Sequence, residues 1–327
     1  MRLCKIRSQE SISICMPWRH SLRNPVSLTG TSEIMKPDFI IAGFSKCGTT
    51  SLAEYLDEHP NIYMVKPKEP RFYVADVINK VSRQDPMHRM LLKKSILTKQ
   101  AYEDLYNHAP ATAILKGEAS VHYANHYEIA IPAIKKHAGD IPIILLLRDP
   151  IARAISNWRF ITLECKTFEA SIDLEMDRIK SGYNSFWWYK YQGIYTNKLR
   201  AFLDNFTKVK ILIFEEFIHS PQLYMTQLYE FLQLPEHTHA NFQRHNIKAI
   251  SLRPKGTILT NHIFSARLTN LARIGYLRMP FRRLVNAFYE EKTNYIPLHI
   301  RNRLHEYYRE DRISLENLLG RQIPCWQ

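Results

Sequence analysis

The chain has 327 residues, 45% of them hydrophobic and 23% charged, so it is long enough to bury a full core and has an ordinary globular composition. Its longest apolar run, residues 141–147, is far shorter than the roughly 18 residues that suggest a membrane span. The five cysteines are scattered and form no C-x-x-C pair, which argues against a disulfide framework and a zinc site and fits a reducing cytosol.

The net charge of +14 is unevenly distributed along the chain. Residues 1–36 carry a net +4, residues 37–243 only +1, and residues 244–327 a net +9. A basic region of this kind is typical either of a solvated surface or of a site for an anionic ligand or polymer, and composition leaves both open.

Residues 1–35 contain Ser, Pro, Asn and Gly without a clear period, so we expect a poorly ordered tail before a single domain of residues 36–327. Arg2, Lys5 and Arg7 precede no apolar stretch, and we therefore expect no secretory signal peptide.

The first unit of the domain reads as a strand, a glycine loop and a helix. The apolar run Phe39–Ala42 indicates a strand that is buried on both faces. A loop from Gly43 to Gly48 follows, and apolar residues at helical spacing in 52–59 predict a helix that ends at Pro60.

The start of this helix is a candidate anion site. The first turn of a helix directs free backbone N–H groups outward, and its dipole favours negative charge there. Lys46 and the hydroxyls of Thr49, Thr50 and Ser51 surround the same point. These residues predict a phosphate site.

The rest of the domain alternates strands and helices. We expect strands at 111–117, 141–149 and 209–214, helices at 76–97, 100–107, 128–137, 152–160, 171–180, 197–205 and 223–232, and one or two helices in 297–319. This order predicts an α/β fold with a P-loop-like parallel sheet and helices on both faces. Ligands of such sheets bind beyond the carboxyl ends of the strands.

The glycine loop departs from a nucleotide-binding Walker A loop, G-x-x-x-x-G-K-[ST]. Gly43 and Gly48 have the right spacing, but Thr49 stands where the Lys belongs, and the Lys is at position 46. No apolar strand ends in an isolated Asp that would serve as a magnesium-holding Walker B acid: Asp149 ends a strand, but it lies between Arg148 and a proline. A P-loop kinase or NTPase stays an alternative that these departures disfavour.

Residues 45–52, SKCGTTSL, resemble the 5′-phosphosulfate loop of sulfotransferases that use 3′-phosphoadenylyl sulfate (PAPS), especially the branch of heparan-sulfate sulfotransferases and their bacterial relatives. The resemblance continues in order over about residues 36–320. It includes K-E-x-x-F-[FY] at 68–73, G-E-[AK]-S at 117–120, L-R-[DN]-P-x-x-R-A-x-S at 147–156, the strand and acids at 209–216, and the helix at 304–319.

The resemblance implies that PAPS is the co-substrate and that no metal is needed. The loop residues that would bind the 5′-phosphosulfate are Lys46, Cys47, Gly48, Thr49, Thr50 and Ser51. Arg148 leaves the strand end and Ser156 lies about two turns into the next helix, where the pair would clasp the 3′-phosphate that ATP lacks. Residues 253–256, RPKG, weakly resemble the family's C-terminal cofactor loop. Lys255 in this segment is therefore also expected to bind the donor.

The transfer itself requires positive charge at the donor and a base for the acceptor. We expect Lys46 to stabilise the leaving phosphate oxygen. Glu69 occupies the position of the branch's catalytic Glu, among Lys66, Lys68 and Arg71, which would keep it ionised, and His122 is the competing base. Ala119 stands where some animal members carry a Lys, so their glycan specificity does not transfer.

The expected acceptor is a hydroxyl, less readily an amine, of a carbohydrate or glycolipid. The aromatic stretch 186–191 fits a sugar platform or, as we prefer, core packing. The basic segment 262–288 fits either a covering helix or a peripheral contact of a cytoplasmic protein with the inner membrane face. A nucleic-acid-binding protein is the alternative from another class. The central net charge of +1 and the lack of a nucleic-acid motif weaken it, and we expect no nucleic-acid partner.

Overall fold

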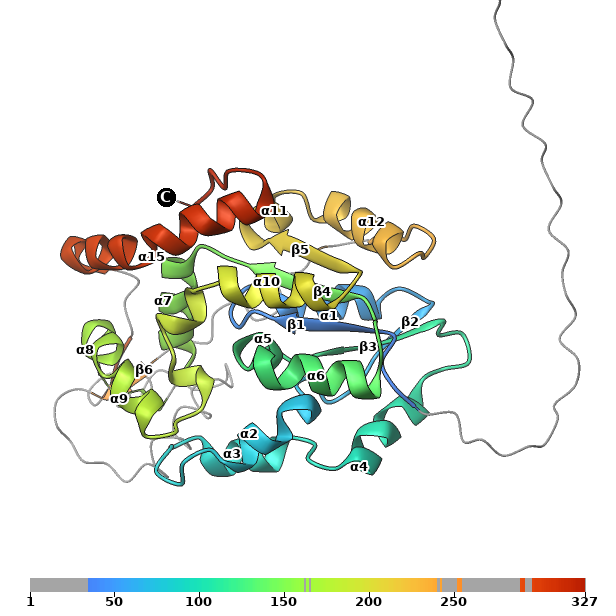
Figure 1. Cartoon of the computed structure of the whole chain (residues 1–327), viewed down its shortest axis with the longest axis horizontal. Coiled ribbons are helices and arrows are strands. Elements are labelled where there is room, and N and C mark those ends of the chain that lie inside the picture. The colour runs from blue at the N-terminus through green and yellow to red at the C-terminus, as the bar shows by residue number, and fades with distance from the viewer. Residues whose placement is uncertain are drawn as a thin grey trace, which may run out of the picture. The chain divides into compact units, whose positions relative to one another are not determined.

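Five parallel strands form the central sheet, in the order β2-β3-β1-β4-β5 (Figure 1). The computed structural model describes residues 35–161, 163–164, 166–239, 242, 252–254, 289–291 and 296–326. The strands are β1 (Phe39–Gly43), β2 (Ile62–Met64), β3 (Leu115–Ala119), β4 (Ile143–Leu147) and β5 (Val209–Ile213). The parallel sheet predicted from the apolar runs is confirmed.

The two central strands are β1 and β4, and every residue in them is buried. Their sequences, FIIAG and IILLL, are apolar at successive positions, as a strand covered on both faces requires. The edge strand β5 is less buried and carries Lys210. The core therefore lies around β1 and β4, whose carboxyl ends carry the glycine loop and Arg148.

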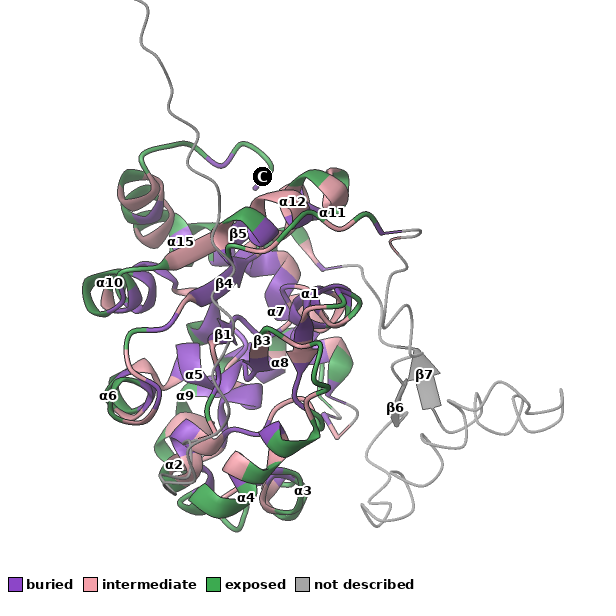
Figure 2. Cartoon of the chain, turned by 90° about the vertical axis from the view of Figure 1, so that its right-hand side faces the viewer, coloured by how far each residue is buried: buried purple, intermediate pink, exposed green. Residues whose placement is uncertain are grey.

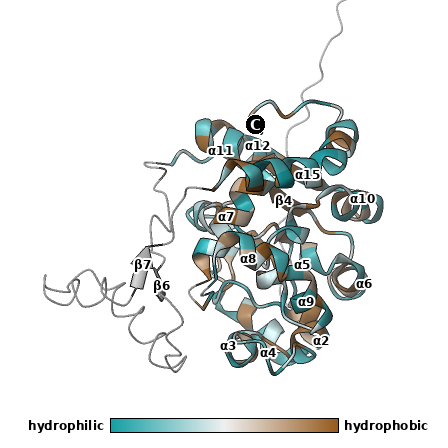
Figure 3. Ribbon diagram, turned by 90° about the vertical axis from the view of Figure 1, so that its left-hand side faces the viewer, coloured by the Kyte–Doolittle hydropathy of each residue, from teal (hydrophilic) through white to brown (hydrophobic). Residues whose placement is uncertain are grey.

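Helices cover both faces of the sheet. In Figure 2, α6 and α10 lie on one side of the strands and α1 lies on the other. The helices α10 and α15 are mainly hydrophilic on the surface, whereas β4 in the interior is hydrophobic (Figure 3). The helices are α1 (Thr49–Asp57), α2 (Ala75–Asn79), α3 (His88–Lys94), α4 (Lys99–Asp104), α5 (His122–Asn125), α6 (Tyr127–His137), α7 (Pro150–Phe160), α8 (Phe168–Asp173), α9 (Glu175–Lys180), α10 (Thr196–Asn205), α11 (Phe214–His219), α12 (Pro221–Phe231) and α15 (Leu298–Leu319).

Several element boundaries differ from those that the sequence predicts. The strand expected at 111–117 begins only at Leu115, because the residues before it form a turn. The helix expected at 76–97 is two helices, α2 and α3. Asp85 holds the break between them, since its carboxylate accepts hydrogen bonds from the backbone N–H groups of Met87 and Asn184. The helix expected at 171–180 is likewise two, α8 and α9, while 297–319 holds the single helix α15.

The strand order places a ligand crevice between β1 and β4. From β1 the chain runs to β2 and β3 on one side, and it then crosses to β4 and β5 on the other. This is a topological switch point, and ligands of open α/β sheets bind outside the carboxyl ends there. A separate antiparallel pair, β6 (Leu252–Pro254) and β7 (Tyr289–Glu291), lies outside the main sheet.

Candidate active site

The glycine loop, residues 43–48, is shaped by two left-handed backbone positions. Lys46 has φ 67° and Gly48 has φ 93°. A Cβ atom on Gly48 would lie 2.8 Å from the ring of Phe214, so this position needs glycine for both its backbone angle and its space. Helix α1 begins at Thr49, and no side chain in the described part of the chain caps it. The N–H groups of its first turn therefore stay available to an anion.

The other loop residues differ in what they offer a ligand. Cys47 is fully buried, with its Sγ 3.6 Å from the carbonyl oxygen of Ser45, and burial raises the pKa of its thiol to about 12. This side chain belongs to the core, so only the backbone of Cys47 faces a ligand site. Thr50 and Ser51 are half-buried in the first turn of α1, where their hydroxyls remain accessible.

Lys46 lies over an aromatic ring. Its Nζ is 3.8 Å from the ring centroid of Phe160, which is 47% exposed at the end of α7. Burial, followed by the charges of Arg148 and Lys68, lowers the pKa of Lys46 to about 8. A neighbouring anion would reverse this shift, so the crowding of cations favours a negatively charged ligand.

Arg148, at the end of β4, is held against the glycine loop. Its Nη1 donates a hydrogen bond to the carbonyl oxygen of Lys46 at 3.1 Å, and its guanidinium lies 4.7 Å from the ring centroid of Phe214. Its Nε is 4.0 Å from a carboxylate oxygen of Glu215. Ser156 lies two turns into the following helix, α7, and is half-buried. The structure thus joins Arg148 directly to the loop that carries Lys46.

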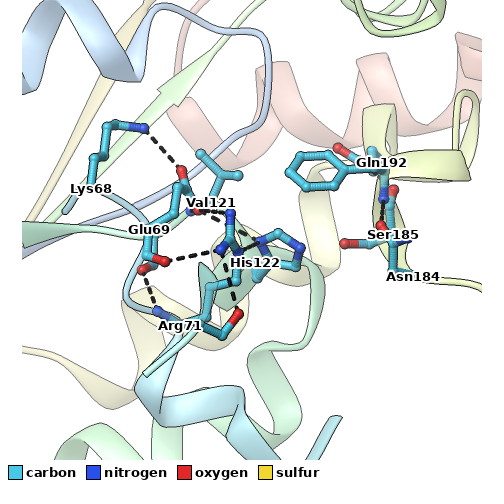
Figure 4. A network of polar contacts seen from close by, with 11 residues as sticks. Lys68, Glu69, Arg71, Val121, His122, Asn184, Ser185 and Gln192 are labelled. Carbon is cyan, nitrogen blue, oxygen red and sulfur yellow. Dashed lines mark hydrogen bonds and ion pairs between the residues drawn. The ribbon is translucent and has the colours of Figure 1, made fainter. Parts of the chain in front are cut away.

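Glu69 is positioned by the end of β3 (Figure 4). Its backbone N–H donates to the carbonyl oxygen of Ala119 at 3.0 Å, and the N–H of Val121 donates to its Oε2 at 3.2 Å. Lys68 Nζ donates to its Oε1 at 2.9 Å, and Arg71 Nη2 lies 3.7 Å from Oε2. The carboxylate side chain is only 15% exposed.

Three neighbours decide the charge state of Glu69. Burial alone would raise the pKa of its carboxyl group, but Lys68, then His122, whose Nδ1 lies 3.6 Å from Oε2, and Arg71 outweigh burial and hold that pKa well below its usual range. Lys66, which the sequence also placed beside Glu69, pairs instead with Asp57 at 2.8 Å. Glu69 is therefore a stable carboxylate at neutral pH.

His122 is buried beside Glu69, and one of its ring nitrogens is occupied. Arg71 Nε donates a hydrogen bond to His122 Nδ1 at 3.1 Å, and a guanidinium can only donate. Nδ1 therefore carries no proton. Burial lowers the pKa of His122, so the ring is neutral with its proton on Nε2. In this arrangement neither nitrogen is free to take a proton from a substrate.

Two aromatic rings connect the lysine with the glutamate. Phe160, under Lys46, has its centroid 6.4 Å from that of Phe186, and Phe186 meets the ring of His122 edge to face at 4.8 Å. These rings thus connect the surroundings of Lys46 with those of Glu69 in one continuous region. Most of the stretch 186–191 is core, as preferred from the sequence: Trp187 and Tyr189 are buried, while Tyr191 is 43% exposed.

Four residues of this site were not singled out by sequence reasoning: Phe160, Phe214, Glu215 and Tyr195, whose hydroxyl donates to the backbone carbonyl oxygen of Arg148 at 2.8 Å. The strand and acids at 209–216 were the available signal for Phe214 and Glu215, which directly follow β5. Nothing in the sequence marks Phe160 or Tyr195. Lys255 and the segment 262–288 lie outside the described residues, as do residues 1–34.

Two features are absent from the described residues. No group of three or more His, Cys, Asp and Glu side chains among them is arranged to hold a metal ion. None of the helices in that part of the chain is long and apolar enough to cross a membrane.

Comparisons with known proteins agree with this fold. The fold is similar to the crystal structure of a sulfotransferase from Alicyclobacillus acidocaldarius, with a TM-score of 0.65 and 24% identity over 89% of this chain and 98% of the other. The membrane-associated sulfotransferase kil1 of Dictyostelium discoideum is 28% identical over 159 residues, which are 48% of this chain and 27% of that protein. The chain therefore spans only about a quarter of the length of that relative. The profile of the sulfotransferase family matches residues 37–238, well over half of the chain, and the protein belongs to that family.

Proposed function

We propose that the protein transfers a sulfuryl group from PAPS to a hydroxyl of a carbohydrate or glycolipid, with an amine as the less favoured acceptor. One observation carries this proposal: the 3.1 Å hydrogen bond from Arg148 to the carbonyl oxygen of Lys46, at the switch point between β1 and β4. It holds Arg148, which directly follows β4, against the loop after β1 that carries Lys46, and PAPS has two anionic ends that need separate sites.

The donor is held by residues from both strands. The first-turn N–H groups of α1, with Thr49, Thr50 and Ser51, bind the 5′-phosphosulfate. Arg148, with Ser156, binds the 3′-phosphate, for which the planar guanidinium is well suited. Lys255 contributes to the same end of the donor.

Transfer is an in-line displacement at sulfur. The acceptor oxygen forms a bond to sulfur while the bond from sulfur to the 5′-phosphate oxygen breaks, and adenosine 3′,5′-bisphosphate leaves. Charge develops on the leaving oxygen, and Lys46 is placed to stabilise it. The enzyme's main contributions are position and positive charge, as in phosphoryl transfer.

Glu69 takes the proton of the acceptor hydroxyl. Its low pKa makes it a weak base, but a hydroxyl oxygen becomes strongly acidic once its bond to sulfur forms, so a weak base suffices late in the displacement. His122 is less suited, because Arg71 occupies its only proton-free nitrogen. His122 instead helps to hold Arg71 beside Glu69.

The position of Asp149 disfavours the kinase alternative. Its Oδ1 accepts a hydrogen bond from the N–H of Ala152 at 2.6 Å, so it caps the start of α7. A magnesium-holding acid would have to be free to bind the ion.

The acceptor class rests on the resemblance to carbohydrate sulfotransferases and on the exposed ring of Phe160 beside Lys46. Exposed aromatic rings offer flat apolar faces to sugar rings.

The test is transfer from radiolabelled PAPS to glycan and glycolipid extracts of the source cells, in the presence of EDTA, with mass spectrometry of the labelled product. We expect a metal-independent sulfated product. Phosphoryl transfer from ATP that requires magnesium, without transfer from PAPS, would overturn the proposal in favour of a kinase.

A further inference from the structure

The carboxylate of Glu215 orients the guanidinium of Arg148. Glu215 Oε1 lies 4.0 Å from Arg148 Nε, and no described residue accepts a hydrogen bond from that Nε. The distance is longer than a direct hydrogen bond, so the carboxylate attracts the guanidinium without occupying its donors. The Arg148 side chain, 24% exposed, keeps donors for a ligand.

Glu215 is itself fixed by two donors on different parts of the chain. Its Oε1 accepts from the backbone N–H of Asp149 at 3.1 Å, and its Oε2 accepts from the indole N–H of Trp326 at 3.0 Å. Trp326 is only 2% exposed. A half-buried carboxylate with both oxygens engaged has little freedom to rotate, so Trp326 fixes the direction from which Glu215 attracts Arg148.

A second route leads from Trp326 to the same arginine. The ring of Trp326 packs on that of Tyr195, with centroids 5.9 Å apart. The hydroxyl of Tyr195 donates to the backbone carbonyl oxygen of Arg148 at 2.8 Å. Trp326 therefore supports Arg148 through its side chain, by way of Glu215, and through its backbone, by way of Tyr195.

We propose that Glu215 and Trp326 are positioning residues that set the affinity of Arg148 for the 3′-phosphate of the donor. The proposal rests on the proposed function, in which Arg148 binds that phosphate. A guanidinium that can rotate freely loses more entropy when it forms two parallel hydrogen bonds to a phosphate. Removing the restraint of Glu215 on Arg148 therefore weakens binding of the 3′-phosphate and leaves the contacts of the glycine loop intact.

The chain offers a matched control. Arg321 binds Glu216, the neighbour of Glu215, through two ion-pair contacts of 2.7 and 2.9 Å. This ion pair anchors the segment that carries Trp326, and it includes neither Glu215 nor Arg148. The substitution Arg321→Gln therefore loosens that segment without removing the support of Arg148.

The experiment compares two ligands by titration calorimetry: adenosine 3′,5′-bisphosphate and AMP, which lacks the 3′-phosphate. We expect Trp326→Phe and Glu215→Gln to weaken the bisphosphate about five- to tenfold, which is about 1 kcal/mol, and to leave AMP unchanged. Arg321→Gln should change neither affinity. Equal weakening of both ligands, or the same loss in Arg321→Gln as in Trp326→Phe, would overturn the proposal.

Arg148→Ala separates this inference from the function on which it rests. If that substitution does not reduce the preference for the bisphosphate over AMP, the 3′-phosphate site of the proposed function is wrong. If it does, while Glu215→Gln and Trp326→Phe keep the wild-type preference, only the positioning role is wrong.

Discussion

In the proposed function, the ends of β1 and β4 form the donor side of the site, and the ends of β2 and β3 lead to its acceptor side. On the donor side Lys46 and Arg148 crowd together, and the nearest acid, Glu215, stays 4.0 Å from Arg148. On the acceptor side Glu69 is in contact with Lys68 and close to Arg71. The donor-side cations therefore stay available to an anion, whereas on the acceptor side the carboxylate of Glu69 already engages its cationic neighbours. This difference predicts that the donor binds without the acceptor.

The largest expected effect comes from removing the donor-side lysine. Lys46→Met should lower the transfer rate about a thousandfold, because a preorganised cation at the leaving oxygen is lost. Single-turnover rates with PAPS would measure it. A loss smaller than about tenfold would mean that Lys46 only balances charge in the free protein.

The acceptor side should respond differently to substitution. Glu69→Gln should lower transfer about a hundredfold, the usual scale of general base catalysis, while the affinity for adenosine 3′,5′-bisphosphate stays within about twofold. His122→Gln is the control, and it should be the milder change. Should Glu69→Gln retain transfer while the His122 variant loses it, the base has been misassigned.

The charge crowding also predicts a pH dependence of donor binding. Only protonated Lys46 attracts the phosphosulfate, and its pKa in the free protein is about 8. Binding is therefore at full strength below pH 8 and weakens as the pH rises through that value, by about tenfold between pH 7 and pH 9. Titration of the bisphosphate across this range measures the slope. Lys46→Met should remove the slope, and a wild-type protein without it would contradict the assigned pKa.

The smallest expected effect concerns the shape of the loop. Gly48 and Gly139 both have positive φ, but a Cβ at Gly139 meets nothing within 4 Å, whereas at Gly48 it meets the Phe214 ring that also packs on Arg148. Gly48→Ala should cost about 1 kcal/mol more unfolding free energy than Gly139→Ala. Denaturant melts of both variants measure this difference. Equal costs would show that backbone strain alone explains the requirement for glycine.

The sequence was most informative where a residue acts through local geometry. The buried runs in β1 and β4 predicted the sheet, and Gly48 followed by Thr49 predicted where α1 begins. Glu69 was placed among cations correctly, although Lys66 turned out to pair with Asp57.

The features of the fold and the site that the sequence did not predict depend on contacts between segments that are far apart in the chain. No local sequence pattern encodes such contacts. The ring of Phe160 under Lys46 and the bond from Trp326 to Glu215 each join residues more than a hundred positions apart. The break between α2 and α3 was missed for the same reason, since Asp85 is held by Asn184.

The central claim is that one ligand fills both a 5′- and a 3′-phosphate site. The most direct measurement is the shift in melting temperature that adenosine 3′,5′-bisphosphate and AMP cause at equal concentration. We predict a far larger shift for the bisphosphate, because Arg148 and Ser156 bind only its 3′-phosphate. Equal shifts with the two nucleotides would contradict the account.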